Sequence, residues 1–327
     1  MKSDNLLLNR NLHIVFSVTM IAVMEVSIIS PVLPTIASSL AITSSQANLM
    51  IVFFTMPGIF LSPFMGIAGD RFGRKKVLVP SLMIFGICGS LCFFVNDFKL
   101  ILLLRFLQGT GSASLGSLNQ TVIGDIFPGR ERITAMGYNS TVLSMGTMIY
   151  PAIGGATALL GWHYPFLVSL LAFPVAAFVA FSLDNPEPVK NGRIGQYLKE
   201  SLSLLKTRQT IALYFTTFAA FTMLYGIILA FYPYYLKEHF TASPFLTGIV
   251  LSSSSVGAMI GSFNMGRFSR ISSSKRMMVA AFTFYILSLG IAFVTPTALL
   301  FVLPVMLYGF ANGILIPPPL RFDILEE

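Results

Sequence analysis

Two ionisable side chains lie well inside apolar stretches of this sequence. Glu25 stands within an apolar run over residues 12–36, and Arg105 stands within another over 99–124. Burying either charge in apolar surroundings is costly, so both residues are candidates for function. Because apolar neighbours disfavour a charged carboxylate, Glu25 could gain and lose a proton near neutral pH. The alternative is a structural ion pair between Glu25 and Arg105 or another buried partner.

Arg105 also begins a stripe of polar and small residues. Its members recur at spacings of three, four and seven, which places them on one face of a helix. They are Arg105, Gln108, Gly109, Ser112, Gly116 and Asn119. Such a face must point to a cavity or to another helix.

A further group of charges lies in the stretch "GIAGDRFGRKK" at 66–76. Its one acid, Asp70, can meet Arg71, Arg74 or the positive N-terminal end of a nearby helix. Such a contact could close one side of the molecule in one state and release it in another. The residues assigned to this gate are Gly66, Asp70, Arg71, Gly73 and Arg74. The alternative is that the positive charge only sets orientation in a membrane.

The stretch 137–155 combines residues that change how a helix packs. Glycines let another helix approach closely, and a proline removes one backbone hydrogen bond and can bend the helix. The residues are Gly137, Gly146, Pro151, Gly154 and Gly155. They predict a bent, close-packed helix at the boundary between two halves. The alternative is ordinary small-residue packing.

Aromatic residues recur at spacings of three and four within 209–236. Such a stripe can line a cavity for apolar or cationic compounds through stacking and cation–π contacts. Aromatic side chains also face lipid, which is the alternative. Together with polar residues from other segments, the predicted cavity set is Gln108, Asn119, Asn139, Phe218, Phe221 and Tyr225.

The elements that carry these residues must be membrane helices. The 327-residue chain is 55% hydrophobic and 10% charged, whereas soluble domains hold about 25% charged residues. Ten apolar segments approach or exceed the roughly 20 residues with which a helix crosses the hydrocarbon core. They cover 12–36, 46–68, 76–95, 99–124, 133–158, 163–183, 209–236, 244–266, 277–295 and 297–318. The alternation typical of membrane strands is missing, so the sequence predicts an all-α integral membrane protein.

Most of the 21 lysine and arginine residues fall in alternate loops. Loops of this kind stay in the cytoplasm. We therefore expect a multi-pass protein of the cell membrane with a cytoplasmic N-terminus. The same bias explains the formal net charge of +8 without a nucleic-acid partner.

The chain also repeats itself. The stretch "RFGRKK" at 71–76 recurs in part as "RFSRISSSKR" at 267–276. A polar, turn-rich stretch at 184–208 divides the two halves. We therefore predict an N-terminal six-helix bundle over 1–183, a cytoplasmic linker over 184–208 and a C-terminal bundle over 209–327.

No catalytic, cofactor or metal constellation is visible. Gly-x-Ser-x-Gly and P-loop patterns are missing, and the three histidines are far apart in the sequence. Cys88 and Cys92 are interpreted as small packing residues. The sequence predicts a protein that is not an enzyme and uses no cofactor and no metal. Its expected partners are a small-molecule substrate, protons and membrane lipid, with no obligate protein partner.

Three of these stretches together resemble one family. Residues 66–76 resemble the loop 2–3 signature of the major facilitator superfamily, and residues 105–113 resemble the helix 4 signature of its proton-coupled exporters. Residues 137–155 resemble the helix 5 antiporter signature, with Tyr150 where that pattern has glycine. The resemblance is greatest to the twelve-helix drug:proton antiporters. It implies two six-helix bundles in parallel repeat and a role in proton transfer for Arg105.

The resemblance further implies proton-coupled export of small amphipathic compounds, of the multidrug-efflux type, by alternating access. One alternative is export of a specific metabolite such as a sugar or siderophore. Another is an inactive, truncated membrane remnant, because twelve helices are expected and ten apolar segments are found. The last segment is followed by "IPPPLRFDILEE". We therefore expect an incomplete second bundle with four helices present.

Overall fold

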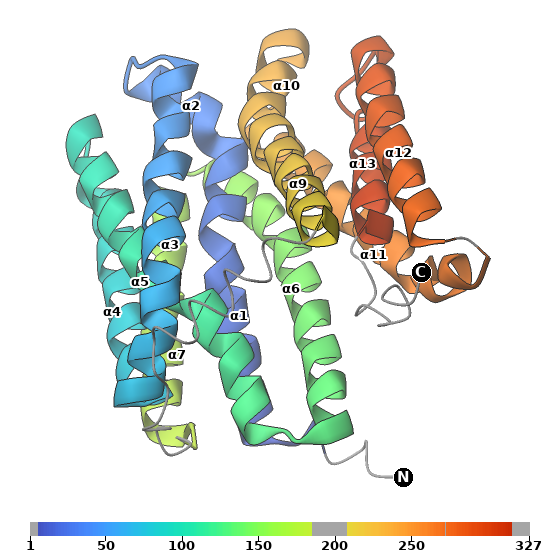
Figure 1. Ribbon diagram of the computed structural model, residues 1–327. Helices are drawn as coiled ribbons and strands as arrows, with labels where there is room; N and C mark the ends of the chain where they lie inside the picture. The colour runs from blue at the N-terminus through green and yellow to red at the C-terminus, as the bar shows by residue number, and fades with distance from the viewer. Residues whose placement is uncertain (1–5, 185–207, 272, 316–327) are drawn as a thin grey trace.

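The computed structural model describes residues 6–184, 208–271 and 273–315, and within these ranges every regular element is a helix (Figure 1). The helices form two groups, named here the first bundle (residues 10–182) and the second bundle (residues 208–315). Each group buries its own cluster of apolar side chains. Almost all of the predicted linker and the proline-rich tail lie outside the described residues, so the domain boundaries stay predictions.

The first bundle holds the helices of the N-terminal half. They are α1 (Arg10–Ile29), η1 (Ser30–Val32), α2 (Leu33–Ser39), α3 (Ser44–Phe72), α4 (Arg74–Leu91), η2 (Cys92–Phe94), α5 (Phe98–Ile126), α6 (Gly129–Thr157), η3 (Tyr164–Leu171) and α7 (Ala172–Ser182). The first three of these elements form one continuous span, and η3 and α7 form another.

The second bundle is built in the same way from the later part of the chain. Its elements are α9 (Arg208–Thr222), the π-helical segment η4 (Met223–Phe231), α10 (Tyr232–Phe240), α11 (Pro244–Ile271), α12 (Ser274–Val294) and α13 (Val302–Leu315). The first three of these again follow one another without a break and contain a single span.

Seven helical spans in the described part of the chain are long and apolar enough to cross a membrane. α5 and α6 are each 29 residues long but contain more polar residues. α13 is shorter, with 14 residues. All ten predicted segments coincide wholly or in part with helices, so the predicted all-α membrane fold is confirmed.

Helix boundaries follow local sequence signals. The Thr43 hydroxyl accepts from the Gln46 N–H at 3.2 Å, and the Gln46 side chain accepts from the Thr43 N–H at 2.9 Å, which is a capping box at the start of α3. Asp97 caps α5 by accepting from the Leu100 N–H at 2.8 Å. Between α3 and α4 the turn is made by Gly73 at φ 94°, a conformation that favours glycine.

The two bundles repeat one packing contact between neighbouring helices. Gly109 of α5 lies against the carbonyl of Phe54 in α3, and Gly309 of α13 lies against the carbonyl of Ser254 in α11. The second contact comes 200 residues after the first at both positions (109 to 309 and 54 to 254). A methyl group at either glycine would collide with the facing backbone, so glycine permits this close approach.

This register corrects the repeat expected from the sequence. The matching residues at 267–270 lie inside the last turns of α11, which continues to Ile271, and not in the loop after it. In the packing register α4 begins at Arg74 and α12 begins at Ser274. The sequence match, with its offset of 196, is therefore about one helical turn out of step with the fold. Basic residues mark a membrane side equally well over a whole turn, so the charge pattern alone could not fix the register.

The bundles meet through α6 and α11. Gly155 of α6 lies against the backbone of α11, and Gly248 of α11 lies against the carbonyl of Pro151 in α6. The contact extends to Ser255, whose Oγ donates to Thr147 Oγ1 at 3.1 Å. Small residues thus line the crossing of the two helices.

Beyond this hydrogen bond α6 and α11 diverge, as Figure 1 shows. Gly137 and Ser140 of α6 and Met259 and Ser262 of α11 are exposed. We name the membrane side with the loop at 69–76 the basic side, and the opposite one the far side. The bundles are therefore joined toward the far side and apart toward the basic side.

Candidate functional site

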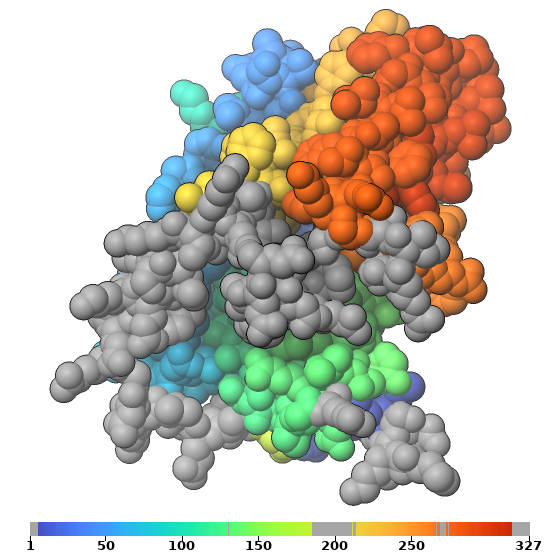
Figure 2. All heavy atoms as spheres, turned by 45° about the vertical axis from the view of Figure 1, so that its right-hand side comes forward, coloured from blue at the N-terminus to red at the C-terminus, as the bar shows by residue number. Residues whose placement is uncertain are grey.

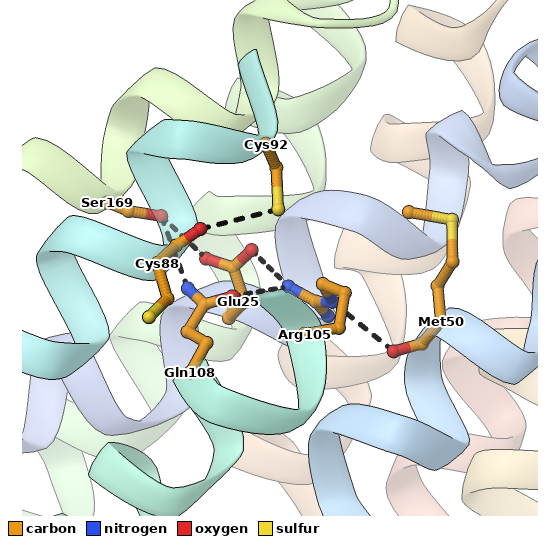
Figure 3. A network of polar contacts seen from close by, with 7 residues as sticks. All are labelled: Glu25, Met50, Cys88, Cys92, Arg105, Gln108 and Ser169. Atoms are coloured by element: carbon orange, nitrogen blue, oxygen red, sulfur yellow. Dashed lines mark hydrogen bonds and ion pairs between the residues drawn. The ribbon is translucent and has the colours of Figure 1, made fainter. Parts of the chain in front are cut away.

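The two buried charges singled out in the sequence form an ion pair. Arg105 Nη1 of α5 donates to Glu25 Oε1 of α1, and the two side chains are 0% and 1% exposed. Figure 3 shows them facing each other between helices of the first bundle. Breaking such a buried pair by removing one partner typically costs about 3–5 kcal/mol, so each charge depends on the other. The ion pair is present, while its part in proton transfer stays a prediction.

Three further groups hold the Arg105 guanidinium. Its Nη1 donates to Gln108 Oε1 at 3.0 Å, and its Nε donates to the carbonyl oxygen of Met50 in α3 at 3.2 Å. The guanidinium carbon lies 4.6 Å from the centre of the Phe54 ring, a cation–π contact. Its Nη2 has no hydrogen-bond partner within the described residues. Arg105 is thus fixed to α3 and α5 independently of the charge on Glu25.

The second carboxylate oxygen of Glu25 accepts from a hydroxyl. Ser169 Oγ of η3 donates to Glu25 Oε2 at 3.0 Å, and Gln108 Nε2 donates to the same Oγ at 3.4 Å. Space for both groups comes from Gly89 in α4, where a methyl group would collide with Gln108 and Ser169. One carboxylate therefore joins α1 to α5 and to η3.

Cys88 and Cys92 border this network in Figure 3. Both are buried and neither forms a disulfide, and Cys92 Sγ donates to the Cys88 carbonyl at 3.4 Å. Within the described residues, no group of His, Cys, Asp or Glu is arranged to hold a metal ion. The chemistry open to this site is therefore that of protons and hydrogen bonds.

Protonation of Glu25 would change the network at one carboxyl group. The charged carboxylate accepts from both Arg105 and Ser169, whereas a protonated carboxyl carries one donor. Arg105 would keep its bonds to Met50 and Gln108. The weakened contact would be the one that holds α1, so this geometry can convert a change of charge into a change in how tightly α1 is held.

Asn119 and Asn139, both predicted to line a cavity, lie in a second buried network. Asn119 Nδ2 donates to the Val15 carbonyl at 3.1 Å and to Thr19 Oγ1, and Thr19 Oγ1 donates to Asn139 Oδ1. These bonds join α5 and α6 to α1. In this conformation Asn119, Asn139 and Gln108 are all buried between helices, and their place in a substrate cavity stays a prediction.

The aromatic residues predicted for the cavity lie on α9 and η4. Phe218 and Phe221 are exposed, and the ring of Phe221 stacks on Tyr225 with centres 6.1 Å apart. Tyr225 is half-buried and packs against the apolar core of the first bundle. Exposure of this kind fits both a cavity wall and a lipid-facing surface, so the cavity role stays a prediction here too.

The charge-rich loop on the basic side is organised around Arg74. Its side chain is 8% exposed and forms ion pairs with Asp70 of α3 and with Asp125 of α5, the latter at 3.0 Å. It also donates to the Gly66 carbonyl at 3.4 Å. Asp70 thus pairs with one of the two arginines that the sequence offered, while Arg71 is exposed. These partners all belong to the first bundle, and the gating role stays a prediction.

The predicted glycine motif lies on α6 and contacts both bundles. Methyl groups at Gly146 and Gly154 would collide with a side chain and with the backbone of α1, respectively. Gly155 and the Pro151 carbonyl face α11, whereas Gly137 has open space around it. The motif therefore lies at the boundary between the bundles and packs α6 on both sides.

Three residues of these networks were not predicted: Ser169, Asp125 and Thr19. Ser169 is a polar residue in the middle of the apolar segment 163–183, and Asp125 ends its helix with the same Gly-Asp pair as 69–70. Both signals could have been used. Thr19 offers no comparable signal, because a threonine in a helix often bonds to its own backbone.

Comparison with known proteins identifies the family. A family model described as Major Facilitator Superfamily matches residues 15–322. The Bacillibactin exporter of Bacillus subtilis (strain 168) is 35% identical over 164 residues, which cover 48% of this chain and 41% of the relative. Multidrug resistance protein 2 of the same strain is 28% identical over 218 residues, covering 65% and 54%. Quinolone resistance protein NorA of Staphylococcus aureus (strain Mu50 / ATCC 700699) is 23% identical over 188 residues, covering 58% and 48%.

The chain thus spans about half the length of the curated relatives it matches. Among solved structures, the nucleoside transporter NupG has a TM-score of 0.77 at 15% identity, covering 94% of this chain and 81% of that one. The D-xylose-proton symporter has a TM-score of 0.74 at 16% identity, covering 93% and 80%. These structures share the fold alone. The family match over most of the chain, the membrane-spanning helices and the shared fold together show that this chain belongs to the major facilitator superfamily of membrane transporters.

Proposed function

We propose that this protein is a proton-coupled exporter of small amphipathic compounds that works by alternating access in the cell membrane. Relatives named multidrug and quinolone resistance proteins support the substrate class. The distribution of lysine and arginine supports a cytoplasmic N-terminus, and hence a cytoplasmic basic side. The proposed partners are the transported compound, protons and lipid.

The buried pair of Glu25 and Arg105 carries this proposal. Ionisable residues inside a membrane mark proton relays and substrate pathways far more often than structural contacts need them. A proton on Glu25 removes one charge of the pair, while Met50 and Gln108 continue to hold Arg105. The element set free by protonation is α1.

α1 connects this pair to the boundary between the bundles. Ile28, one turn after Glu25, lies against Gly154 of α6. Ser30, which follows directly after α1, donates to the Leu229 carbonyl of the second bundle at 2.7 Å. A shift of α1 on protonation would thus reach the bundle contact within about two helical turns. Coupling needs such a connection, because a proton can drive transport only if it favours one conformation over another.

The conformation fits one state of an alternating-access cycle. The bundles are joined toward the far side and apart toward the basic side, which is an inward-open arrangement if the basic side is cytoplasmic. The cluster around Arg74 lies at the end of the first bundle beside that opening. In the proposed gate, Asp70, Arg71 and Arg74 exchange partners when the basic side closes, and Gly66 and Gly73 accommodate the change.

Efflux of ethidium from cells tests the proposal. Cells that express the protein should lose ethidium faster than control cells, and a protonophore should abolish the difference. Efflux that survives collapse of the proton gradient would rule out proton coupling. A folded, membrane-inserted protein that exports nothing tested would instead support the inactive remnant.

Replacing Glu25 tests the role of the ion pair directly. Glu25→Gln keeps the size of the side chain and removes its titration, so uphill efflux should be lost while ethidium binding to the purified protein persists. Glu131→Gln, at the exposed start of α6, is the matched control and should alter neither. If Glu25→Gln still builds a gradient, another group carries the proton.

Export of one specific metabolite is the second candidate. The Bacillibactin exporter has a higher identity to this chain than the two resistance proteins, at 35%. An efflux panel of dyes, sugars and siderophores, bacillibactin included, separates the two candidates. Export of one metabolite with no dye efflux would favour the specific exporter.

A further inference from the structure

The far-side contact between the bundles is made in part by a lysine. Lys237 lies in the last turn of α10. Its Nζ crosses to the first bundle, where it donates to the Pro34 carbonyl at 3.0 Å and to Ser38 Oγ at 3.1 Å. Ser38 Oγ also lies 3.1 Å from the Pro34 carbonyl. Ammonium, hydroxyl and carbonyl thus form one closed set of contacts between α10 and α2.

The chemistry of this contact suits a cation. The last turn of a helix carries partial negative charge on its free carbonyls, and α2 ends at Ser39, directly after Ser38. Hydrogen bonds from a charged donor are stronger than those from a neutral one. A lysine at the far end of a span also opposes the bias that places basic residues on the cytoplasmic side. The bond to α2 supplies a local reason for its position.

Two neutral hydrogen bonds flank the lysine. Ser30 Oγ donates to the Leu229 carbonyl at 2.7 Å, and Pro233, four residues after Leu229, has no N–H to donate to that carbonyl. The Tyr234 hydroxyl donates to the Ser44 carbonyl at 3.4 Å. These bonds connect the same two regions, the outer end of the first span and α10 with η4. Figures 1 and 2 show α2 and α10 at the same end of the molecule.

We propose that Lys237 is a latch that holds the far side closed while the basic side is open. The latch rests on the proposed alternating-access function. Opening the far side requires Nζ to leave Pro34 and Ser38, and water can then solvate the ammonium because this end of α10 lies at the surface. A charged donor that is either paired or hydrated suits a contact that must form and break in each cycle.

Cysteine labelling tests the latch without any substrate. Val32 is 0% exposed in η1, between the bundles, so Val32→Cys reports opening of the far side. In a Cys88→Ala/Cys92→Ala background in proteoliposomes, a membrane-impermeant maleimide is added at the far side. Lys237→Met should raise the labelling rate about tenfold, as expected for loss of a charge-assisted hydrogen bond. Lys237→Arg, which keeps the charge, should stay closer to the parent.

Two controls separate opening from other effects. Lys99→Met removes another lysine near the far side, at the exposed start of α5, and should leave labelling unchanged. Ala113→Cys, buried in α5 within the first bundle, should stay unlabelled in every variant. Unchanged labelling of Val32→Cys in Lys237→Met would overturn the latch, and so would equal increases in Lys99→Met or at Ala113→Cys. Because no substrate or gradient is involved, such a result leaves the export proposal to be judged by efflux alone.

Discussion

The two bundles share a helix packing but differ in what they bury at its centre. Both use a glycine against a facing backbone carbonyl, in the same register. In that register the first bundle buries Arg105 and Gln108, where the second bundle buries Val305 and Tyr308. The same packing thus surrounds an ion pair in one bundle and apolar and aromatic side chains in the other.

The polar contacts near Tyr308 are all between neutral groups. Tyr285 stacks on Tyr308 with ring centres 4.9 Å apart and donates to Asn312 Oδ1 at 3.3 Å. Ser288 Oγ donates to the Pro304 carbonyl at 2.7 Å. The fold therefore does not require charge at its centre. The ion pair is an addition specific to the first bundle, which is why we interpret it as functional.

Removing one charge of the pair should have the largest effect on this comparison. Arg105→Met should destabilise the protein by about 3–5 kcal/mol, because Glu25 then stays buried without its partner. Joint replacement by Glu25→Leu and Arg105→Met should restore most of the stability but not uphill transport. Thermal unfolding in detergent can be followed through the single tryptophan, Trp162. If Arg105→Met unfolds at the parent temperature, the pair does not hold the first bundle together.

Filling the shared glycine contact should affect both bundles alike. Gly109→Ala and Gly309→Ala each place a methyl group against a carbonyl of the neighbouring helix, so each should cost about 1–3 kcal/mol. Gly116→Ala has open space around it and should be neutral or slightly stabilising. The measurement is again the unfolding temperature. A large effect at one of the first two positions and none at the other would mean that the bundles do not depend equally on this contact.

The smallest effect is expected where the two centres differ in hydrogen bonding. The Tyr308 hydroxyl is buried and has no hydrogen-bond partner in the described part of the chain. Tyr308→Phe should therefore change stability by less than about 1 kcal/mol, or raise it slightly, because no bond is lost. Gln108→Leu, at the matching position, removes bonds to Arg105 and Ser169 and should destabilise clearly more. Equal losses in the two variants would contradict the contrast between the bundles.

Much of the fold and the identity of the buried charges could be predicted from sequence, but their partners could not. Glu25 and Arg105 stood out because each interrupts an apolar run. Asp70 was expected to meet an arginine, yet the buried arginine that it shares with Asp125 emerged only from the packing of α3 beside α5. Asn119 illustrates the opposite error of emphasis: its polarity suggested a cavity, but a neighbouring helix meets its amide in this conformation.

By itself the sequence determined which segments are helices and in what order they cross the membrane. That information is local, because a segment in lipid must satisfy its backbone hydrogen bonds internally, and an apolar run of sufficient length does so as a helix. Only the tertiary structure decided that Glu25 meets Arg105 across 80 residues and that Lys237 reaches Pro34 in the other bundle. Such contacts depend on the depth and rotation of each helix against its neighbours. These are set jointly by the packing of many side chains, so no single segment encodes them.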